Sequence, residues 1–429
     1  MKVTFISLGC AKNLVDSEYI LGLLRQERSI EIIDSVEESD AIFINTCGFI
    51  NDAKQEAIDT IFSVINNKSE NSYVIVIGCL AKRYKEVLEK EIPEIDLIVG
   101  VDEYDNIGDK LNDLFNLKLP KTYDPLKRSL SNPLPVAYLK IGEGCSNRCA
   151  YCAIPLIRGD YHSYNKELII EDAKRLISLG KKEIIVIAQD PTRYGKDIYE
   201  DYGIEELMDD LAKLDSLTYF RVLYLYPDRI TDKLIDVFIQ NPNIMPYFDI
   251  PIQHSSNNVL KLMGRTGTKE KYIDVINKIK ERIPNAILRT TLIVGFPGET
   301  HKDFLDLKEF VQQIKFDHLG VFTFSDEEDT LSNKMPNKVN KRLAKQRMKE
   351  IMKIQQDISF KLNKNRINEV HDVLIEDFDG NNYYGRSYLY APDAEDGNFI
   401  IHSKSNLIIG EFVKVKINKV NAYDVEGDL

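Results

Sequence analysis

The stretch Cys145-Ser146-Asn147-Arg148-Cys149-Ala150-Tyr151-Cys152 places three cysteines within eight residues near the middle of a 429-residue chain. Three thiolates at this spacing can hold three irons of a cubane [4Fe-4S] cluster and leave its fourth iron open. A structural zinc site usually takes four ligands, often from two Cys-x-x-Cys pairs, and no matching second pair lies nearby in the sequence. The stretch, called the cysteine triplet below, therefore predicts an iron-sulfur site with one free coordination position.

The segment around the triplet, residues 136–324, alternates between strand and helix patterns about six times, which predicts a partial (βα) barrel. In such folds the active site lies at the C-terminal ends of the strands, and the triplet directly follows the first strand. Helical patterns over 166–179 and 270–282 separate some of the strands. The expected strands are 136–141, 183–188, 218–224, 247–251, 286–294 and 318–324.

Several polar or small residues occupy the expected strand ends of this barrel. Gln189, Gln253 and Arg289 are candidate ligand-binding side chains by that position alone. Gly295, just before a helix, could bring a backbone amide to a ligand, and a plain strand-to-helix turn explains it equally well. His254 is more simply read as a satisfied, partly buried histidine than as a ligand-pocket group.

The first part of the chain repeats the strand-and-helix pattern on a shorter scale and predicts a parallel α/β layer, with strands at 3–8, 41–45, 73–77 and 95–101. Cys10, Cys47 and Cys79 each lie just past one of the first three strands. Because the carboxyl ends of parallel strands meet at one edge, these three thiols predict a second cluster. The alternative, in which each is a small buried apolar side chain, explains single positions better than the repeated placement.

Composition restricts the class of protein. The chain carries 56 Lys and Arg against 68 Asp and Glu, a net charge of -12, which disfavours a general polyanion-coating role and leaves local basic patches open. Without a run of 18 apolar residues or a signal-peptide core, it is expected to be cytoplasmic and without a membrane contact. In that reducing compartment six cysteines favour metal ligands or catalytic groups over disulfides.

Prolines at 120, 125, 133 and 135 mark a linker, so the expected domains are 1–120, 134–362 and 363–429. The stretch 338–366 carries ten Lys or Arg and an apolar helical stripe; a solvated connecting helix is the default interpretation, and an RNA-facing patch is the alternative. Short β-rich runs after 363 predict a small antiparallel β barrel. Its 12 acidic and 7 basic residues argue against a strong grip on phosphates. The expected fold class is thus α/β, with a parallel α/β domain, a partial (βα) barrel and a small β barrel.

The triplet, with aromatic Tyr151 before its last cysteine, resembles the Cys-x-x-x-Cys-x-aromatic-Cys signature of the radical S-adenosylmethionine (SAM) enzymes. That resemblance implies that the open iron binds the amino and carboxylate groups of SAM and that Tyr151 contacts its adenine. Gln189, Arg289 and Gly295 are candidates for the rest of the SAM site by their positions at strand ends alone.

The whole chain resembles the methylthiotransferases, which join an N-terminal three-cysteine domain, a radical SAM domain and a C-terminal TRAM domain. The resemblance implies two [4Fe-4S] clusters, with Cys10, Cys47 and Cys79 as ligands of the auxiliary one. The run from Ser7 to Glu18, Ser-Leu-Gly-Cys-Ala-Lys-Asn-Leu-Val-Asp-Ser-Glu, is similar to the branch that modifies an aspartate of small-subunit ribosomal protein twelve.

The chemistry implied by this resemblance uses two molecules of SAM. One methylates a sulfur species at the auxiliary cluster; the other is reductively cleaved at the triplet cluster, and the resulting radical removes hydrogen from the aspartate β-carbon, which then captures the methylthio group. The implied partners are ribosomal protein twelve, free or on the ribosome, and an electron donor such as flavodoxin or ferredoxin; an RNA contact rests only on the alternative interpretation of the basic stretch 338–366. The competing interpretations are a methylthiotransferase acting on adenosine in transfer RNA, and a non-catalytic iron-sulfur carrier or RNA-binding module.

Overall fold

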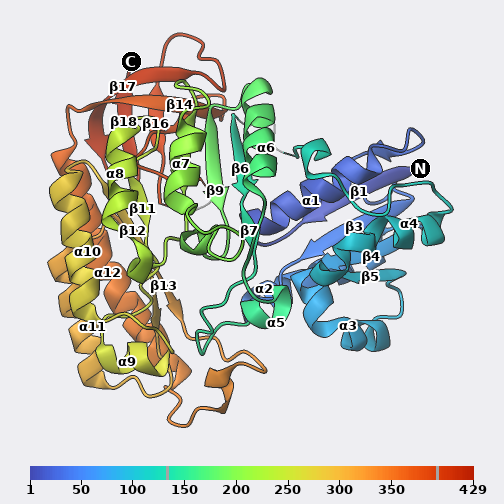
Figure 1. Cartoon of the computed structure of the whole chain (residues 1–429), viewed down its shortest axis with the longest axis horizontal. Helices are drawn as coiled ribbons and strands as arrows, with labels where there is room; N and C mark the ends of the chain where they lie inside the picture. Colours follow the sequence, from blue (N-terminus) through green and yellow to red (C-terminus); the bar gives the residue numbers. More distant parts are fainter. Residues whose placement is uncertain (132–134, 393–395) are drawn as a thin grey trace.

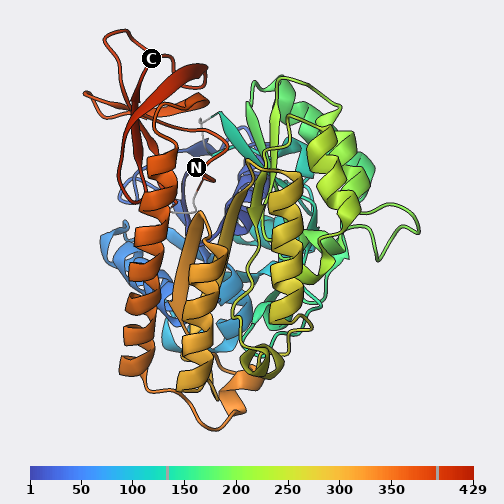
Figure 2. The same cartoon turned by 90° about the vertical axis from the view of Figure 1, so that its left-hand side faces the viewer.

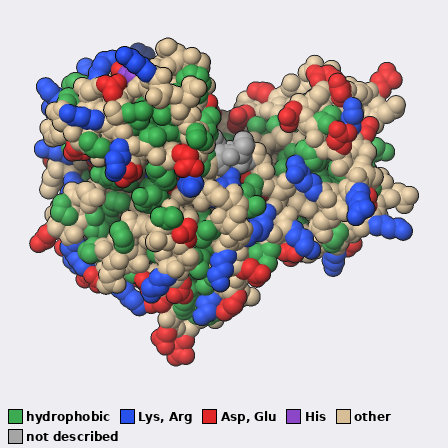
Figure 3. Space-filling model, turned by 90° about the horizontal axis from the view of Figure 1, so that it is seen from above, with side chains coloured by type: hydrophobic (Ala, Val, Ile, Leu, Met, Phe, Trp, Pro, Cys, Tyr) green, Lys and Arg blue, Asp and Glu red, His purple; other side chains and the backbone are tan. Residues whose placement is uncertain are grey.

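Three parts follow one another along the chain in the computed structural model, which describes residues 1–131, 135–392 and 396–429 (Figure 1). The linker residue Pro133 and the expected domain start at Leu134 lie outside the described residues. Seen from above, the surface divides into two lobes with a hollow between them, and acidic and basic side chains are interspersed over both (Figure 3).

The first part is a five-stranded sheet whose neighbouring strands all run parallel, in the order β2-β1-β3-β4-β5. Two apolar clusters cover its faces: α1 and α4 pack on one, and α2 and α3 on the other. The four expected strands are confirmed, whereas the two-residue edge strand β2 is too short to leave a periodic signal. The elements are β1 (Lys2–Ser7), α1 (Ala11–Leu24), β2 (Glu31–Ile32), β3 (Ala41–Thr46), α2 (Asn51–Asn67), β4 (Tyr73–Gly78), α3 (Cys79–Glu91), β5 (Leu97–Gly100) and α4 (Ile107–Phe115).

The second part confirms the expected partial barrel of six parallel strands. Two three-stranded sheets, β6-β9-β10 and β11-β12-β13, are joined by a parallel bridge between Phe220 and Ile244. The strands are β6 (Val136–Lys140), β9 (Glu183–Ile187), β10 (Tyr219–Val222), β11 (Tyr247–Asp249), β12 (Ile287–Val294) and β13 (His318–Thr323). The helices along it are α6 (Lys166–Ser178), α7 (Ile204–Ala212), α8 (Asp232–Gln240), α9 (Asn257–Leu262), α10 (Lys269–Arg282) and α11 (His301–Ile314).

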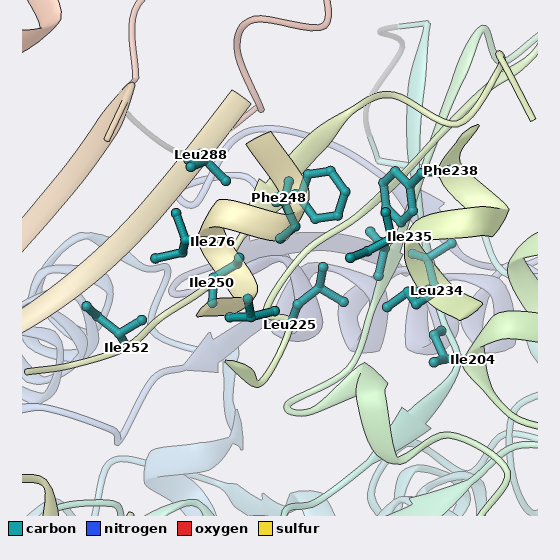
Figure 4. Packing of buried hydrophobic residues seen from close by; sticks show 14 of the residues in the cluster. Ile204, Leu225, Leu234, Ile235, Phe238, Phe248, Ile250, Ile252, Ile276 and Leu288 are labelled. Carbon is teal, nitrogen blue, oxygen red and sulfur yellow. The ribbon is translucent and has the colours of Figure 1, made fainter. Parts of the chain in front are cut away.

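The core of this barrel lies between its strands and the outer helices. Phe238 of α8 stacks on Phe248 of β11 with ring centroids 4.4 Å apart, and Leu288 and Ile276 lie in the same buried cluster (Figure 4). Successive residues of a strand point to opposite faces, so Arg289, next to Leu288, belongs to the face turned away from these helices. That face also carries Ile287, which belongs to a separate buried apolar cluster.

The third part is a closed barrel in the order β14-β15-β16-β18-β17. The expected antiparallel arrangement is confirmed for four of its strand pairs. The fifth pair, β16 with β18, is parallel, and β18 was not anticipated from the sequence. Its strands are β14 (Val370–Phe378), β15 (Tyr383–Arg386), β16 (Phe399–His402), β17 (Phe412–Val420) and β18 (Val425–Asp428).

Helix α12 (Lys341–Asn365) connects the partial barrel to the closed barrel (Figure 2). It continues three residues past the boundary expected at 362/363, because the polar run that ends it is helical and not strand-forming. In the described ranges of the chain, no helix is both long and apolar enough to cross a membrane.

Contacts among the three parts fix their relative positions. A single buried cluster contains Val15 of α1, Tyr138 of β6, Tyr247 of β11 and Leu389 of the closed barrel segment. A smaller cluster packs Cys79, at the start of α3, against Ala153 and therefore next to the triplet. The strand ends that carry the N-terminal cysteines thus face the strand end that carries the triplet.

Candidate functional site

The cysteine triplet lies on a loop between the short strand β7 (Gly142–Glu143) and helix α5 (Ile154–Arg158). Two backbone hydrogen bonds attach the loop to distant segments. The Ala150 N–H donates to the Met263 carbonyl at 2.8 Å, and the Ala150 carbonyl accepts from the Ser332 N–H at 2.8 Å. Two of the three thiols are buried and the third is half-buried. The predicted position of the triplet, just after the first barrel strand, is confirmed.

A buried carboxylate supports the middle of this loop. Asp190, which follows β9, is 1% exposed and accepts from Asn147 Nδ2 and from Arg229 Nη1, both at 2.7 Å. Arg229 Nη2 also donates to Asn147 Oδ1 at 2.7 Å. The sequence indicates the adjacent Gln189 at this strand end and gives no role to Asp190 or Arg229; Asn147 carries a signal only through its place inside the triplet.

The surroundings of the triplet fit an iron-sulfur cluster. Burial raises the pKa of the Cys145 thiol to about 11, and that of Cys152 further still, with neighbouring Cys149 adding to both shifts. Without metal these thiols keep their protons at neutral pH, and metal binding releases them. Three soft sulfur donors on one loop are the ligand type that [4Fe-4S] clusters take.

Across residues 1–131, 135–392 and 396–429, no three His, Cys, Asp or Glu side chains are close enough to share one metal ion. A cubane cluster binds each thiolate through a different iron, so its ligands stand around a body larger than one ion. The distances between the three thiols of the triplet therefore need to fit a cluster, and they need not fit a single metal ion.

Tyr151 is placed beside the triplet by aromatic and cationic neighbours. Its ring meets Phe296 edge-on with centroids 6.4 Å apart, and its hydroxyl accepts from Arg265 Nη1 at 3.5 Å. Arg265 in turn lies over the ring of Tyr226, 4.4 Å from the centroid. Burial raises the pKa of the Tyr151 hydroxyl well above its usual value, so the ring stays neutral. The half-buried ring is fixed next to the loop.

Of the other predicted SAM-site residues, Gln189 lies where the sequence suggested. It follows β9, and its Nε2 donates to Glu143 Oε1 at 2.5 Å. Its Oε1 is buried, and the described part of the chain supplies no hydrogen-bond partner for it. A buried acceptor of this kind is suited to a ligand N–H or O–H.

The predictions for Gly295 and Arg289 need correction. Glu299 Oε2 accepts the N–H groups of both Gly295 and Phe296, so these amides are not offered to a ligand. A Cβ at Gly295 would lie 2.5 Å from the Cβ of Ala344, which explains the glycine by helix packing. Arg289 is the third residue of β12 and not at its end.

Arg289 is instead held by two carboxylates. Its Nη1 donates to Asp249 Oδ1 at 2.9 Å and its Nε lies 3.4 Å from Asp396 Oδ1. Gln253 does follow its strand, with a left-handed φ of 69°. His254 is fully buried, and its Nδ1 accepts from the Ser256 N–H at 2.9 Å; burial lowers the pKa of its imidazole to about 4.

The three N-terminal cysteines follow β1, β3 and β4 as predicted. Gly9 has φ +89°, and a Cβ there would lie 2.8 Å from Cys47 Cβ, so the chain passes closely beside that cysteine. Burial raises the pKa of the Cys79 thiol to about 12; Arg158 opposes this shift, and Cys10 and Cys47 add to it. The mutual effect shows that the three thiols share one neighbourhood.

Arg158, the last residue of α5, lies between the two sets of cysteines. Its Nη2 donates to Cys79 Sγ at 3.3 Å and to Asn13 Oδ1 at 2.7 Å. The same nitrogen donates to Asp16 Oδ2 at 2.8 Å, and Nη1 donates to Glu143 Oε2 at 2.7 Å. One guanidinium thus links the N-terminal sheet to the loop of the triplet.

A second buried cation completes this connection. Lys140 Nζ of β6 donates to Asp16 Oδ1 at 2.7 Å and also pairs with Glu143. Cations bound to both carboxylates compensate the cost of removing their charges from water, and the pKa of Glu143 falls to about 2, since Arg158 and Lys140 outweigh its desolvation. We call Asp16, Lys140, Glu143 and Arg158 the bridging network.

Gly144 offers a test of how tightly the loop must be positioned. It has φ +76°, and a Cβ there would lie 2.2 Å from the Asp160 carbonyl oxygen. We expect Gly144→Ala to shift the adjacent cysteine and to reduce the iron bound per chain after reconstitution by at least half. The control, Gly180→Ala, has the same backbone handedness at φ +81° with nothing within 4 Å of the added atom. It should cost about 1–2 kcal/mol and leave the iron content unchanged; equal iron loss in both variants would contradict the prediction.

Three family descriptions match consecutive parts of the chain. "Uncharacterized protein family UPF0004" matches residues 2–100, "Radical SAM superfamily" matches residues 139–311 and "TRAM domain" matches residues 367–429. The expected order of three-cysteine domain, radical SAM domain and TRAM domain agrees with these matches.

Curated relatives align over nearly their whole length. A protein of Clostridioides difficile (strain 630), named ribosomal protein uS12 methylthiotransferase RimO, is 48% identical, with 100% of this chain and 99% of the relative covered. Proteins of the same name from Alkaliphilus oremlandii and Acetivibrio thermocellus are 45% and 43% identical, each over 100% of this chain and 99% and 98% of the relative.

Among solved structures, the radical SAM methyltransferase TsrM from Kitasatospora setae, with cobalamin and a [4Fe-4S] cluster bound, aligns with a TM-score of 0.53 at 12% identity, covering 75% of this chain and 74% of its own. The cobalamin-dependent SAM radical enzyme OxsB aligns with a TM-score of 0.51 at 14% identity, covering 83% of this chain and 57% of its own. At these identities the likeness concerns the fold alone.

Proposed function

We propose the function of this chain from one premise, namely that it belongs to the RimO family of ribosomal protein uS12 methylthiotransferases. Within that family it is a radical SAM methylthiotransferase that uses SAM and a [4Fe-4S] cluster. We infer that it adds a methylthio group to the β-carbon of an aspartate in ribosomal protein uS12, free or on the ribosome.

The observation that carries this proposal is the bridging network between the two sets of cysteines. Arg158 contacts Cys79 directly and reaches Glu143, which accepts from Gln189 beside the triplet. A reaction that uses two cofactors in sequence needs both of them at one cavity. Only Arg158, Glu143 and Gln189 lie between Cys79 and the triplet in this series of contacts, which supports such an arrangement. A simple carrier of electrons has no need of it.

In this proposal Cys145, Cys149 and Cys152 hold the SAM-binding [4Fe-4S] cluster, and Cys10, Cys47 and Cys79 hold a second one. When bound, the clusters and SAM supply the one-electron chemistry that breaks an unactivated C–H bond and the sulfur that replaces the hydrogen. The Tyr151 ring would orient the nucleoside, and Gln189 Oε1 would accept one of its hydrogen bonds.

The remaining residues act by holding geometry and excluding water. The buried Asp190 keeps the triplet loop against the strand ends, and Arg158 keeps the N-terminal sheet against α5. An external electron donor such as flavodoxin or ferredoxin would reduce the clusters. The division into domains at 1–120, 134–362 and 363–429, with the last boundary moved past Asn365, belongs to the same proposal.

The substrate is tested by comparing a strain that lacks this gene with the same strain carrying the gene again. We expect intact uS12 from the deletion strain to lack the mass of one methylthio group that replaces one hydrogen, and the complemented strain to regain it. Methylthio-adenosine in transfer RNA should be equal in both strains. Loss of the methylthio-adenosine, with uS12 unchanged, would assign the transfer RNA substrate instead.

A further inference from the structure

Helix α12 carries five cations along its outer side that have no ion-pair partner among the described residues. All five are exposed, and together they line a shallow hollow on the helix surface. We call them the α12 stripe: Lys341, Arg342, Lys345, Lys349 and Lys353. Glu350 also lines the hollow and binds Lys308 of α11 at 3.1 Å, so it does not neutralise the stripe.

The opposite side of α12 is fixed to the partial barrel. Arg347 Nη1 pairs with buried Glu299 at 2.9 Å, and Gln355 Nε2 donates to the Phe316 carbonyl at 2.7 Å. Ile351, between them, is fully buried. Figure 2 shows the helix at the outer edge of the molecule, running beside α11 towards the closed barrel. The stripe is therefore presented on a rigid element.

The stripe is costly for the helix that carries it. Lys341, Lys345, Lys349 and Lys353 repeat at every fourth residue, and each like-charged pair at this spacing costs about 0.2–0.5 kcal/mol. The first turn contains no acidic residue, so its cations also face the positive end of the helix dipole. In a chain of net charge -12, acidic side chains outnumber basic ones, so folding does not require five neighbouring cations without an acidic partner.

Some exposed lysines on other helices of the partial barrel are paired. Lys213 of α7 contacts Asp209, and Lys233 of α8 contacts Glu206. Lys278 of α10 lies 3.6 Å from Asp274. On the face seen from above, acidic and basic side chains are interspersed (Figure 3). The α12 stripe instead gathers five cations without an ion-pair partner among the described residues on one helix, which points to a partner that brings the negative charge.

We propose that the α12 stripe binds the phosphate backbone of ribosomal RNA next to the protein substrate, an inference that rests on the proposed function. The four lysines extend over about 18 Å at steps of about 6 Å, with Arg342 beside the first of them, a linear array suited to a continuous polyanion. Lysine carries its charge on one ammonium group and lacks the planar guanidinium with which arginine makes paired hydrogen bonds. We therefore expect contacts with phosphates, which position the enzyme, and no sequence-specific contacts with bases.

Charge elsewhere in the chain agrees with this assignment. Residues 363–429, which form the closed barrel, hold 12 acidic and 7 basic side chains and are a poor counterpart for phosphates. A ribosomal protein on its subunit is surrounded by RNA. An enzyme that modifies an aspartate of that protein on the subunit therefore comes close to RNA phosphates. The stripe supplies the attraction that the net charge of the chain opposes.

The test measures binding of the full-length protein to a fluorescein-labelled RNA hairpin of about 20 base pairs at several KCl concentrations. The variant Lys345→Gln/Lys349→Gln/Lys353→Gln should lower the slope of log K against log[KCl] by about two to three, because each phosphate contact contributes about 0.7–0.9. The melting temperature should not fall, because the three positions are exposed and the substitutions remove like-charged pairs from the helix.

The matched control is Lys213→Gln/Lys233→Gln/Lys278→Gln, which changes net charge equally but removes paired lysines. Its salt slope should equal that of the wild type. Equal slopes for the two triple variants, or displacement of the RNA by poly-glutamate as efficient as by unlabelled RNA, would overturn the proposal; the second result would assign an acidic protein as the partner.

A second measurement separates this inference from the proposed function. Modification of uS12 within assembled small subunits should slow at least several-fold in the stripe variant, while modification of free uS12 should proceed at the wild-type rate. If the wild-type protein modifies neither form, the proposed function fails, and the salt slopes still report whether the stripe binds RNA. Equal rates on assembled subunits would contradict the RNA contact.

Discussion

Replacing all three cysteines of the triplet with alanine is expected to reduce 5'-deoxyadenosine formation to the level seen without protein. In the proposed function the triplet would hold the cluster that supplies the electron for cleavage of SAM, and the loop carries no fourth cysteine. The measurement is the yield of 5'-deoxyadenosine from reconstituted protein incubated with dithionite and SAM.

The control for this experiment is the triple alanine variant of Cys10, Cys47 and Cys79. It should keep 5'-deoxyadenosine formation and lose methylthio transfer to uS12, and the iron bound by each triple variant should fall to about half of the wild-type value. Normal formation of 5'-deoxyadenosine in the triplet variant would overturn the assignment of that cluster. A wild-type protein that forms none would identify a non-catalytic iron-sulfur carrier.

Replacing Arg158 with methionine should produce the largest loss of stability of any single substitution in the bridging network. Its side chain is 2% exposed and is the partner of both Asp16 and Glu143. Without Arg158, the two buried carboxylates would share the single charge of Lys140, and breaking a buried ion pair costs about 3–5 kcal/mol. Urea denaturation of the protein before cluster reconstitution measures this loss without any contribution from bound iron.

The control is Arg148→Met, at an exposed ion pair. Arg148 contacts Asp160 at 2.6 Å, with both side chains more than 60% exposed (61% and 63%), and such pairs contribute about 0–1 kcal/mol. Arg158→Lys keeps the charge but cannot donate to four acceptors, so its stability should lie between the other two. Similar midpoints for Arg158→Met and Arg148→Met would show that the bridging network does not hold the two parts together.

Much of the site could be predicted because the signals are local. The spacing of the triplet and the position of Cys10, Cys47 and Cys79 after strands depend on a few neighbouring residues, and the structure confirms those placements. Two corrections concern contacts and positions that local patterns do not specify. Arg289 lies near the start of β12, and the amide of Gly295 is taken by a carboxylate four residues later.

The sequence by itself determined the three-part architecture, the two sets of thiols and the strand ends that carry them. Apolar periodicity and ligand spacing act over short separations, so they can be recognised before the chain is folded. Only the tertiary structure decided which buried charges meet. Arg158 and Asp16 are 142 residues apart, and neither carries a local signal for the other. Their pairing depends on packing between the N-terminal sheet and α5, because a charge can be buried only where the fold brings it a partner.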